Sequence, residues 1–141
     1  MGRILAIDYG QKRVGLAVTD PLKISANGLD TVLSNELFVY LKNYIEKEAV
    51  ETIVVGLARQ LNGQDSASMK LIQPFVVGLK RTFPEIPVVM YDERFTSTLA
   101  HATLLASGAK KKDRQDKALV DKIAATILLQ SYLESNRNQN F

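Results

Sequence analysis

The chain has 141 residues, of which 46% are hydrophobic and 23% are charged, and its formal net charge at pH 7 is +3. It contains no cysteine and one histidine, which excludes disulfides, thiolate metal centres and multi-histidine zinc sites. A divalent ion would therefore be held by oxygen ligands, which favours Mg²⁺ or Mn²⁺.

Branched apolar residues over Arg3–Gly10 predict a β-strand that ends at a glycine. Side chains alternate faces along a strand, so Asp8 shares a face with Ala6 and not with Ile7. Both faces are apolar, which predicts a central strand covered on both sides. The carboxylate of Asp8, at the end of a buried face, needs a hydrogen-bond donor, a counter-charge or a metal ion as its partner. A structural role, in which Asp8 only accepts a hydrogen bond within the turn that follows, is an alternative of equal weight.

The rest of the chain predicts a three-stranded meander and then strands that alternate with helices. The connection after Asp8 is too short for a parallel crossover, so the strand over Val14–Asp20 forms an antiparallel hairpin with the first. Asp20 itself, before a proline, is predicted to be a turn residue rather than a ligand.

The remaining predicted elements follow in chain order. They are a strand over Ile24–Val32, a helix from a Ser34 cap to Glu48, a strand over Glu51–Leu57, a helix capped by Asp65 or Ser66, a strand over Ile86–Tyr91, a helix from Thr96 or Ser97 to Gly108, and a helix over Asp116–Glu134. Pro74 should kink the second helix or mark a late start. This order predicts an α/β fold with a mixed five-stranded sheet and helices on both faces.

One domain over residues 1–135 is expected, followed by a polar, flexible tail over residues 136–141. No apolar run is long enough to span a membrane, and no signal peptide precedes the first strand. We therefore expect a cytoplasmic location and no membrane partner.

Asp121 falls in the middle of the apolar stripe of the last helix on a helical wheel, which aims its carboxylate at the sheet. The neighbouring alanines allow the helix to approach a strand closely. A surface ion pair with Lys117 or Lys122 is the alternative.

Asp92 and Glu93 end a predicted buried strand, as Asp8 does, and the ends of parallel strands gather at one edge of a sheet. Alternation leaves open which of the two acids points toward Asp8. Clustered carboxylates need cations, and a pair of Mg²⁺ or Mn²⁺ ions suits phosphodiester hydrolysis.

Basic residues are concentrated between Lys110 and Lys122, a segment with six basic and three acidic residues. A basic patch of this kind suits a nucleic-acid backbone, and a solvated loop is the alternative on charge alone. The candidates for backbone contacts are Lys12, Arg13, Arg94, Lys110, Lys111, Lys112 and Arg114. Arg94 has a second option, an ion pair with Asp92 or Glu93.

Five short motifs stand in order along the chain: Ile-Asp-Tyr-Gly at 7–10, Gly-Leu-Ala-Val-Thr-Asp at 15–20, Val-Val-Gly-Leu at 54–57, Asp-Glu-Arg-Phe-Thr-Ser at 92–97 and Val-Asp-Lys-Ile-Ala-Ala at 120–125. Together they resemble the YqgF/RuvX family of Holliday junction resolvase-like nucleases, which is implicated in maturing the 5′ end of pre-16S ribosomal RNA. The resemblance implies an RNase H-like fold. It also implies a metal-binding, catalytic trio of Asp8, Glu93 and Asp121, and so favours Glu93 over Asp92.

The chain departs from the family pattern in two places. Ala58 stands where family members usually have proline, and Phe95-Thr96-Ser97 replaces the usual Leu-Thr-Thr. Both departures bear on loop shape near the site, and neither removes an implied ligand.

The leading hypothesis is a metal-dependent endonuclease that processes the 5′ end of pre-16S rRNA, resolves Holliday junctions, or does both. A homodimer would suit an enzyme that cuts both strands of a junction. One alternative is a non-catalytic module that binds nucleic acid or the ribosome. A weaker one is a fragment of an actin-like ATPase, because Asp8-Tyr9-Gly10 followed by Gly15 resembles the phosphate loop of such proteins.

Overall fold

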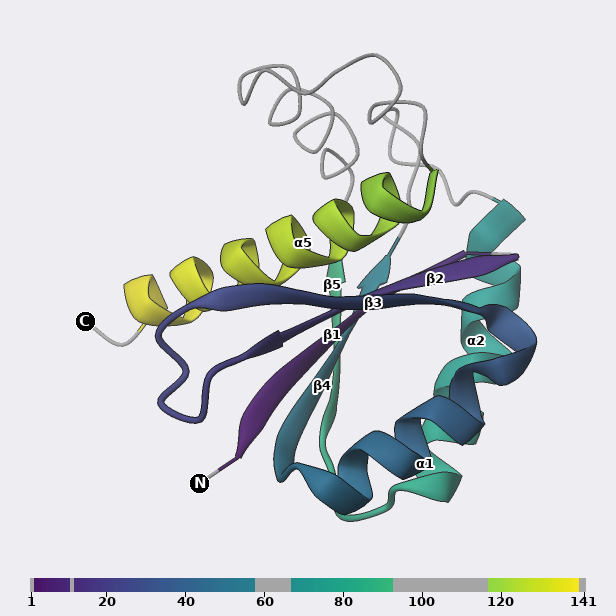
Figure 1. Ribbon diagram of the computed structural model, residues 1–141, viewed down its shortest axis with the longest axis horizontal. Coiled ribbons are helices and arrows are strands. Elements are labelled where there is room, and N and C mark those ends of the chain that lie inside the picture. Colours follow the sequence, from purple (N-terminus) through teal and green to yellow (C-terminus); the bar gives the residue numbers. More distant parts are fainter. Residues whose placement is uncertain (1, 11, 58–66, 93–116, 140–141) are drawn as a thin grey trace.

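A five-stranded mixed sheet forms the centre of the computed structural model, with helices on both faces (Figure 1). The structure describes residues 2–10, 12–57, 67–92 and 117–139. The elements are β1 (Arg3–Tyr9), β2 (Arg13–Thr19), β3 (Ala26–Leu33), the 3-10 turn η1 (Ser34–Glu36), α1 (Leu37–Lys47), β4 (Val50–Leu57), α2 (Ala67–Thr82), β5 (Val88–Asp92) and α5 (Lys117–Gln139). The helix expected over residues 96–108 lies outside the described part of the chain.

The strands lie in the order β3-β2-β1-β4-β5, so β1 is central, as its two apolar faces predict. β1 pairs antiparallel with β2, and β2 with β3, which confirms the meander. β4 is parallel to both β1 and β5. The carboxyl ends of these three parallel strands therefore meet at one edge of the sheet.

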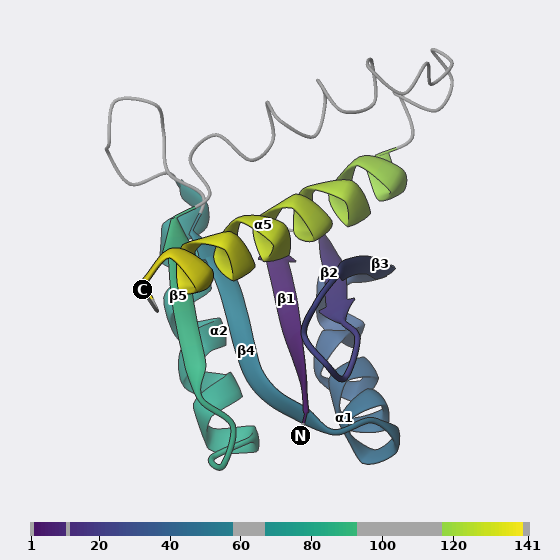
Figure 2. The same ribbon diagram turned by 90° about the vertical axis from the view of Figure 1, so that its left-hand side faces the viewer.

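Strand alternation divides the hydrophobic core into two layers. Leu5 and Ile7 of β1 pack in the layer that includes residues of α1 and α2. Ala6 packs with residues of α5 in the second layer, on the opposite face. Figure 2 shows α5 on one side of the sheet, with α1 and α2 on the other. Asp8 follows Ala6 by two positions and so lies on the α5 face, as predicted.

The start of α1 differs from the prediction. Ser34 does not cap the helix, because α1 begins at Leu37 after a 3-10 turn and its first residues have no side-chain cap. The backbone N–H of Ser34 instead donates to the carbonyl of Lys12 at 2.9 Å. This bond ties the end of β3 to the turn between β1 and β2.

Two further boundaries differ from the sequence pattern. Pro74 lies inside α2, which starts at Ala67, so the late-start interpretation is wrong. α5 continues to Gln139, beyond the end predicted at Glu134. Residues 136–139 of the expected tail are therefore helical. No helix among the described residues is both long and apolar enough to cross a membrane.

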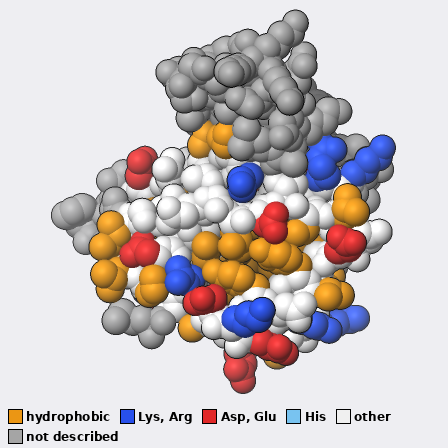
Figure 3. Space-filling model, viewed as in Figure 1, with side chains coloured by type: hydrophobic (Ala, Val, Ile, Leu, Met, Phe, Trp, Pro, Cys, Tyr) orange, Lys and Arg blue, Asp and Glu red, His pale blue; other side chains and the backbone are white. Residues whose placement is uncertain are grey.

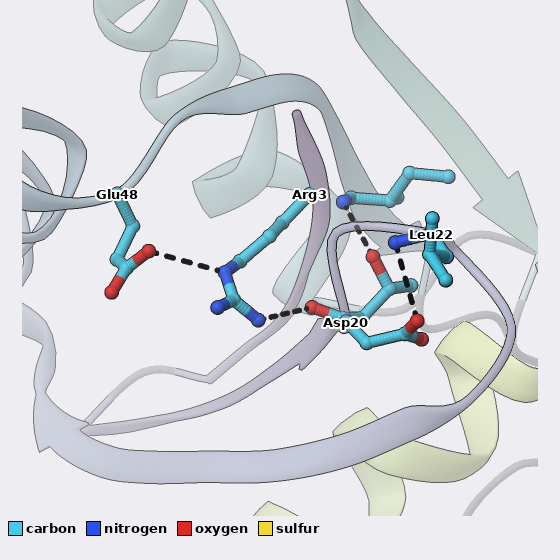
Figure 4. Close-up of polar contacts among 6 residues, drawn as sticks. Arg3, Asp20, Leu22 and Glu48 are labelled. Atoms are coloured by element: carbon cyan, nitrogen blue, oxygen red, sulfur yellow. Dashed lines mark hydrogen bonds and ion pairs between the residues drawn. The ribbon is translucent and has the colours of Figure 1, made fainter. Parts of the chain in front are cut away.

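Polar contacts close the edge of the sheet opposite the carboxyl ends of the parallel strands (Figure 4). Arg3 pairs with Glu48 at 3.4 Å, and its Nη1 donates to the carbonyl of Thr19 at 2.9 Å. The carboxylate of Asp20 accepts hydrogen bonds from the backbone N–H groups of Leu22, Ile24 and Ser25. The prediction that Asp20 is a turn residue is confirmed.

These backbone donors, Ser25 foremost, lower the pKa of Asp20. A lowered pKa in the folded state stabilises the fold above the unfolded pKa of about 4, and this contribution is lost as the pH falls. Asp20→Asn should therefore be less stable than the wild type at pH 7, and the difference should shrink below about pH 4. Urea denaturation across this range measures it. A difference that stays constant with pH would contradict the assignment.

The core layer beneath β2 predicts a strong contrast between two leucines. Leu16 is fully buried, whereas Leu22 is 62% exposed. Leu16→Ala should lower the free energy of unfolding by about 2–5 kcal/mol, because it leaves a cavity. Leu22→Ala is the control and should change it by less than about 0.5 kcal/mol. Urea denaturation of both variants tests the contrast, and equal effects would contradict the described packing.

Candidate active site

Gly15 of β2 is the point where β1, β2 and α5 meet. Asp8 lies directly opposite Gly15 in the antiparallel ladder. The backbone of Asp121 lies against Gly15 from α5, since a Cβ added to this glycine would be 2.6 Å from the carbonyl carbon of Asp121. Two acids far apart in the sequence are thus both neighbours of one glycine. The prediction that Asp121 faces the sheet is confirmed.

Small side chains on this face explain how α5 comes so close. Ala6 lies opposite Ala17 in the β1–β2 ladder, and both are fully buried beneath the helix. Ala125 of α5 is fully buried against them in the same layer. Larger residues at these positions would hold the helix away from the sheet. The close approach that the alanines predict is therefore present.

The carboxylate of Asp121 is held by an arginine from β2. Arg13 Nε donates to Asp121 Oδ2 at 2.9 Å, and the two side chains are 36% and 26% exposed, respectively. The partner is thus Arg13 and not Lys122, whose side chain lies near Gly28 of β3. Asp121 is thus a partly exposed acid that pairs with a residue of β2, while the side chain of Lys117, the other predicted partner, lies outside the described part of the chain.

This role of Arg13 was not predicted from the sequence, where Arg13 is a candidate for contacts to nucleic acid. The signal was present in the strand alternation, because Arg13, Gly15 and Ala17 occupy every second position of β2 and so share the α5 face. The sequence does not show, however, where along β2 the helix α5 packs, and this position is what brings Asp121 next to Arg13.

The third predicted acid comes from the end of β5. The backbone of Asp92 pairs with Leu57 at the carboxyl ends of β5 and β4, which is the edge where Asp8 lies. Tyr91 reaches the α5 side, where its ring meets that of Tyr132 edge-on at a centroid distance of 6.0 Å. Glu93 lies outside the described residues, as do Arg94, Lys110, Lys111, Lys112 and Arg114.

Among the residues that the structure describes, no group of three or more acidic, histidine or cysteine side chains could hold a metal. Asp8 and Asp121, the predicted ligands in this part of the chain, are both neighbours of Gly15. Lys12, in the turn beside Asp8, is exposed.

The close approach at Gly15 is open to a direct test. Gly15→Ala would push a methyl group into the backbone of Asp121, so it should lower the free energy of unfolding by about 1–3 kcal/mol or more.

Gly28→Ala is the matched control on the neighbouring strand. Its Cβ would meet the flexible side chain of Lys122, which can move aside, so the loss should be clearly smaller. Chemical denaturation compares the two, and an equal or larger effect at Gly28 would argue against the Gly15–Asp121 contact.

Comparison with known proteins supports the family resemblance. Residues 2–135 match the family model RuvX, described as Holliday junction resolvase. A Bacteroides thetaiotaomicron protein named "Putative pre-16S rRNA nuclease" is 59% identical over 137 residues, which cover 97% of this chain and 99% of that protein. A protein of the same name from Flavobacterium johnsoniae is 51% identical over 137 residues, with the same coverage.

Two solved structures share the fold. A complex of Fowlpox virus resolvase with Holliday junction DNA matches with a TM-score of 0.60 and 12% identity, covering 95% of this chain and 98% of that one. Thermus thermophilus RuvC with a Holliday junction substrate matches with a TM-score of 0.56 and 16% identity, covering 97% and 96%. These likenesses confirm the RNase H-like fold. By its family model and by its relatives over nearly the whole length, the chain belongs to the YqgF/RuvX family of nucleases.

Proposed function

We propose that this protein is a divalent-metal-dependent endonuclease that hydrolyses phosphodiester bonds in structured nucleic acid. The observation that carries the proposal is the convergence of Asp8 and Asp121 on Gly15, at the edge where the parallel strands end. Ligands of open α/β sheets collect at such an edge.

The residues at this edge fit a divalent cation. Both acids offer carboxylate oxygens, which are the donors that Mg²⁺ and Mn²⁺ prefer. The positively charged guanidinium of Arg13 already lies beside Asp121, with Nε 2.9 Å from Oδ2. The same surroundings therefore accept positive charge. When bound, one or two such ions would supply an activated water and would stabilise the leaving oxygen.

We assign the role of third ligand to Glu93, on the basis of the family motif. Asp8 sits on the central strand and Asp121 on a helix whose backbone touches β2. Both carboxylates are thus held by rigid elements, which suits a site that must orient a scissile phosphate.

We assign contacts to the nucleic-acid backbone to the basic residues that the sequence singles out. Lys12 is exposed in the turn between β1 and β2, and Arg94 directly follows Glu93 in the family motif. The remaining candidates, chosen by their charge in the sequence, are Lys110, Lys111, Lys112 and Arg114. Such contacts position a strand without reading its sequence.

The leading substrate is a precursor of 16S rRNA, because the relatives that match at 51–59% identity carry that substrate in their names. Such a substrate would be met in the cytoplasm. A four-way DNA junction is the second candidate, since the fold matches two proteins solved with Holliday junctions. A homodimer would suit this second substrate, because a junction has two strands to cut.

A cleavage assay on a labelled rRNA precursor and a four-way DNA junction tests the proposal, with Mg²⁺, Mn²⁺ or chelator present. Asp8→Asn and Asp121→Asn should each lower the rate on the order of 100-fold or more, because each removes a ligand. Asp20→Asn, at the opposite edge of the sheet, is the control and should cut at close to the wild-type rate.

Binding of either substrate without cleavage under any metal would overturn the nuclease proposal and favour a binding module. Thermal stabilisation by nucleotides would favour the ATPase alternative instead.

A further inference from the structure

We propose that Arg13 is a positioning residue that serves as the resident counter-charge of Asp121 and must leave this carboxylate when a divalent cation binds. The proposal rests on the metal-dependent function above and adds a role for a residue that the family motifs do not assign as a ligand.

Asp121 lies where a carboxylate needs a counter-charge. Asp8 and Asp121 both border Gly15, and a partly buried carboxylate with another acid in its surroundings is stabilised by a nearby cation. The guanidinium of Arg13 supplies that cation, with Nε 2.9 Å from Asp121 Oδ2. A divalent cation bound by Asp121 would compete with this guanidinium for the same carboxylate.

The Arg13–Asp121 ion pair is exposed enough to water to open easily. The side chains of Arg13 and Asp121 are 36% and 26% exposed, so water can replace each partner as the other leaves. Ion pairs this exposed contribute little to stability. The pair is thus poorly suited as a structural clamp and well suited as an interaction that a stronger ligand displaces.

Arg13–Asp121 differs from two other ion pairs of the described chain in what it contains. Arg3–Glu48 is reinforced by a hydrogen bond from Arg3 to the carbonyl of Thr19, and Lys23–Glu51 joins the loop after β2 to β4. Neither pair includes a proposed metal ligand. Arg13–Asp121 does, so a cation bound by Asp121 competes with Arg13 and with neither of the other bases.

Mn²⁺ binding measured by isothermal titration calorimetry tests the proposal without relying on activity. Arg13→Gln removes the competing charge, so the dissociation constant for Mn²⁺ should fall by about tenfold. The melting temperature of this variant in chelator should stay close to that of the wild type, because an ion pair this exposed contributes little to stability. Its rise on adding Mn²⁺ should exceed that of the wild type.

Lys23→Gln is the matched control, because it removes one positive charge from a partly exposed pair away from the site. Its Mn²⁺ affinity should stay within about twofold of the wild type. Arg13→Lys keeps the charge but not the Nε donor, so it should bind Mn²⁺ with intermediate affinity. This variant keeps the proposal testable if Arg13→Gln fails to fold.

Unchanged or weaker Mn²⁺ binding in Arg13→Gln, or in Arg13→Lys if only that variant folds, would overturn the proposal, because Arg13 would then not compete with the cation. A wild type that binds no Mn²⁺ would overturn the metal-dependent function together with it. The two failures are distinguishable, since the first requires a wild type that binds the ion.

Discussion

The contact between Gly15 of β2 and the backbone of Asp121 is the constraint on which the site depends. It requires a residue without a side chain on β2 and small residues, Ala17 and Ala125, around it. Where these conditions hold, α5 lies close enough to the sheet for its acid to join Asp8 of the central strand. Larger side chains at these positions would hold α5, and with it Asp121, further from the sheet.

Strand alternation made much of this predictable from the sequence. Asp8 shares the face of Ala6, and the helical wheel turns Asp121 toward that face, so two local periodicities predict that both acids lie on one side of the sheet. The cap predicted at Ser34 was wrong because the chain forms a 3-10 turn over Ser34–Glu36 before α1 begins. The Ser34 N–H donates to the carbonyl of Lys12, a partner that only the folded hairpin supplies. Arg13 was missed for the same kind of reason, since pairing across elements depends on register and helix height, which local patterns do not contain.

Family membership and geometry support the function in different ways. The relatives and the family model assign the chain to a group of nucleases, while the fold alone would host many activities. The geometry adds which residues act together: two acids on rigid elements, with an arginine that neutralises one of them. If the proposed role of Arg13 holds, this arginine would neutralise Asp121 until a divalent ion replaces it.

The most direct test of this account is anomalous X-ray scattering from crystals grown with Mn²⁺. The account predicts a manganese peak in contact with carboxylate oxygens of Asp8 and Asp121, with Arg13 no longer bonded to Asp121 Oδ2. A peak elsewhere, or no peak at saturating Mn²⁺ while the Arg13–Asp121 pair remains at 2.9 Å, would contradict it.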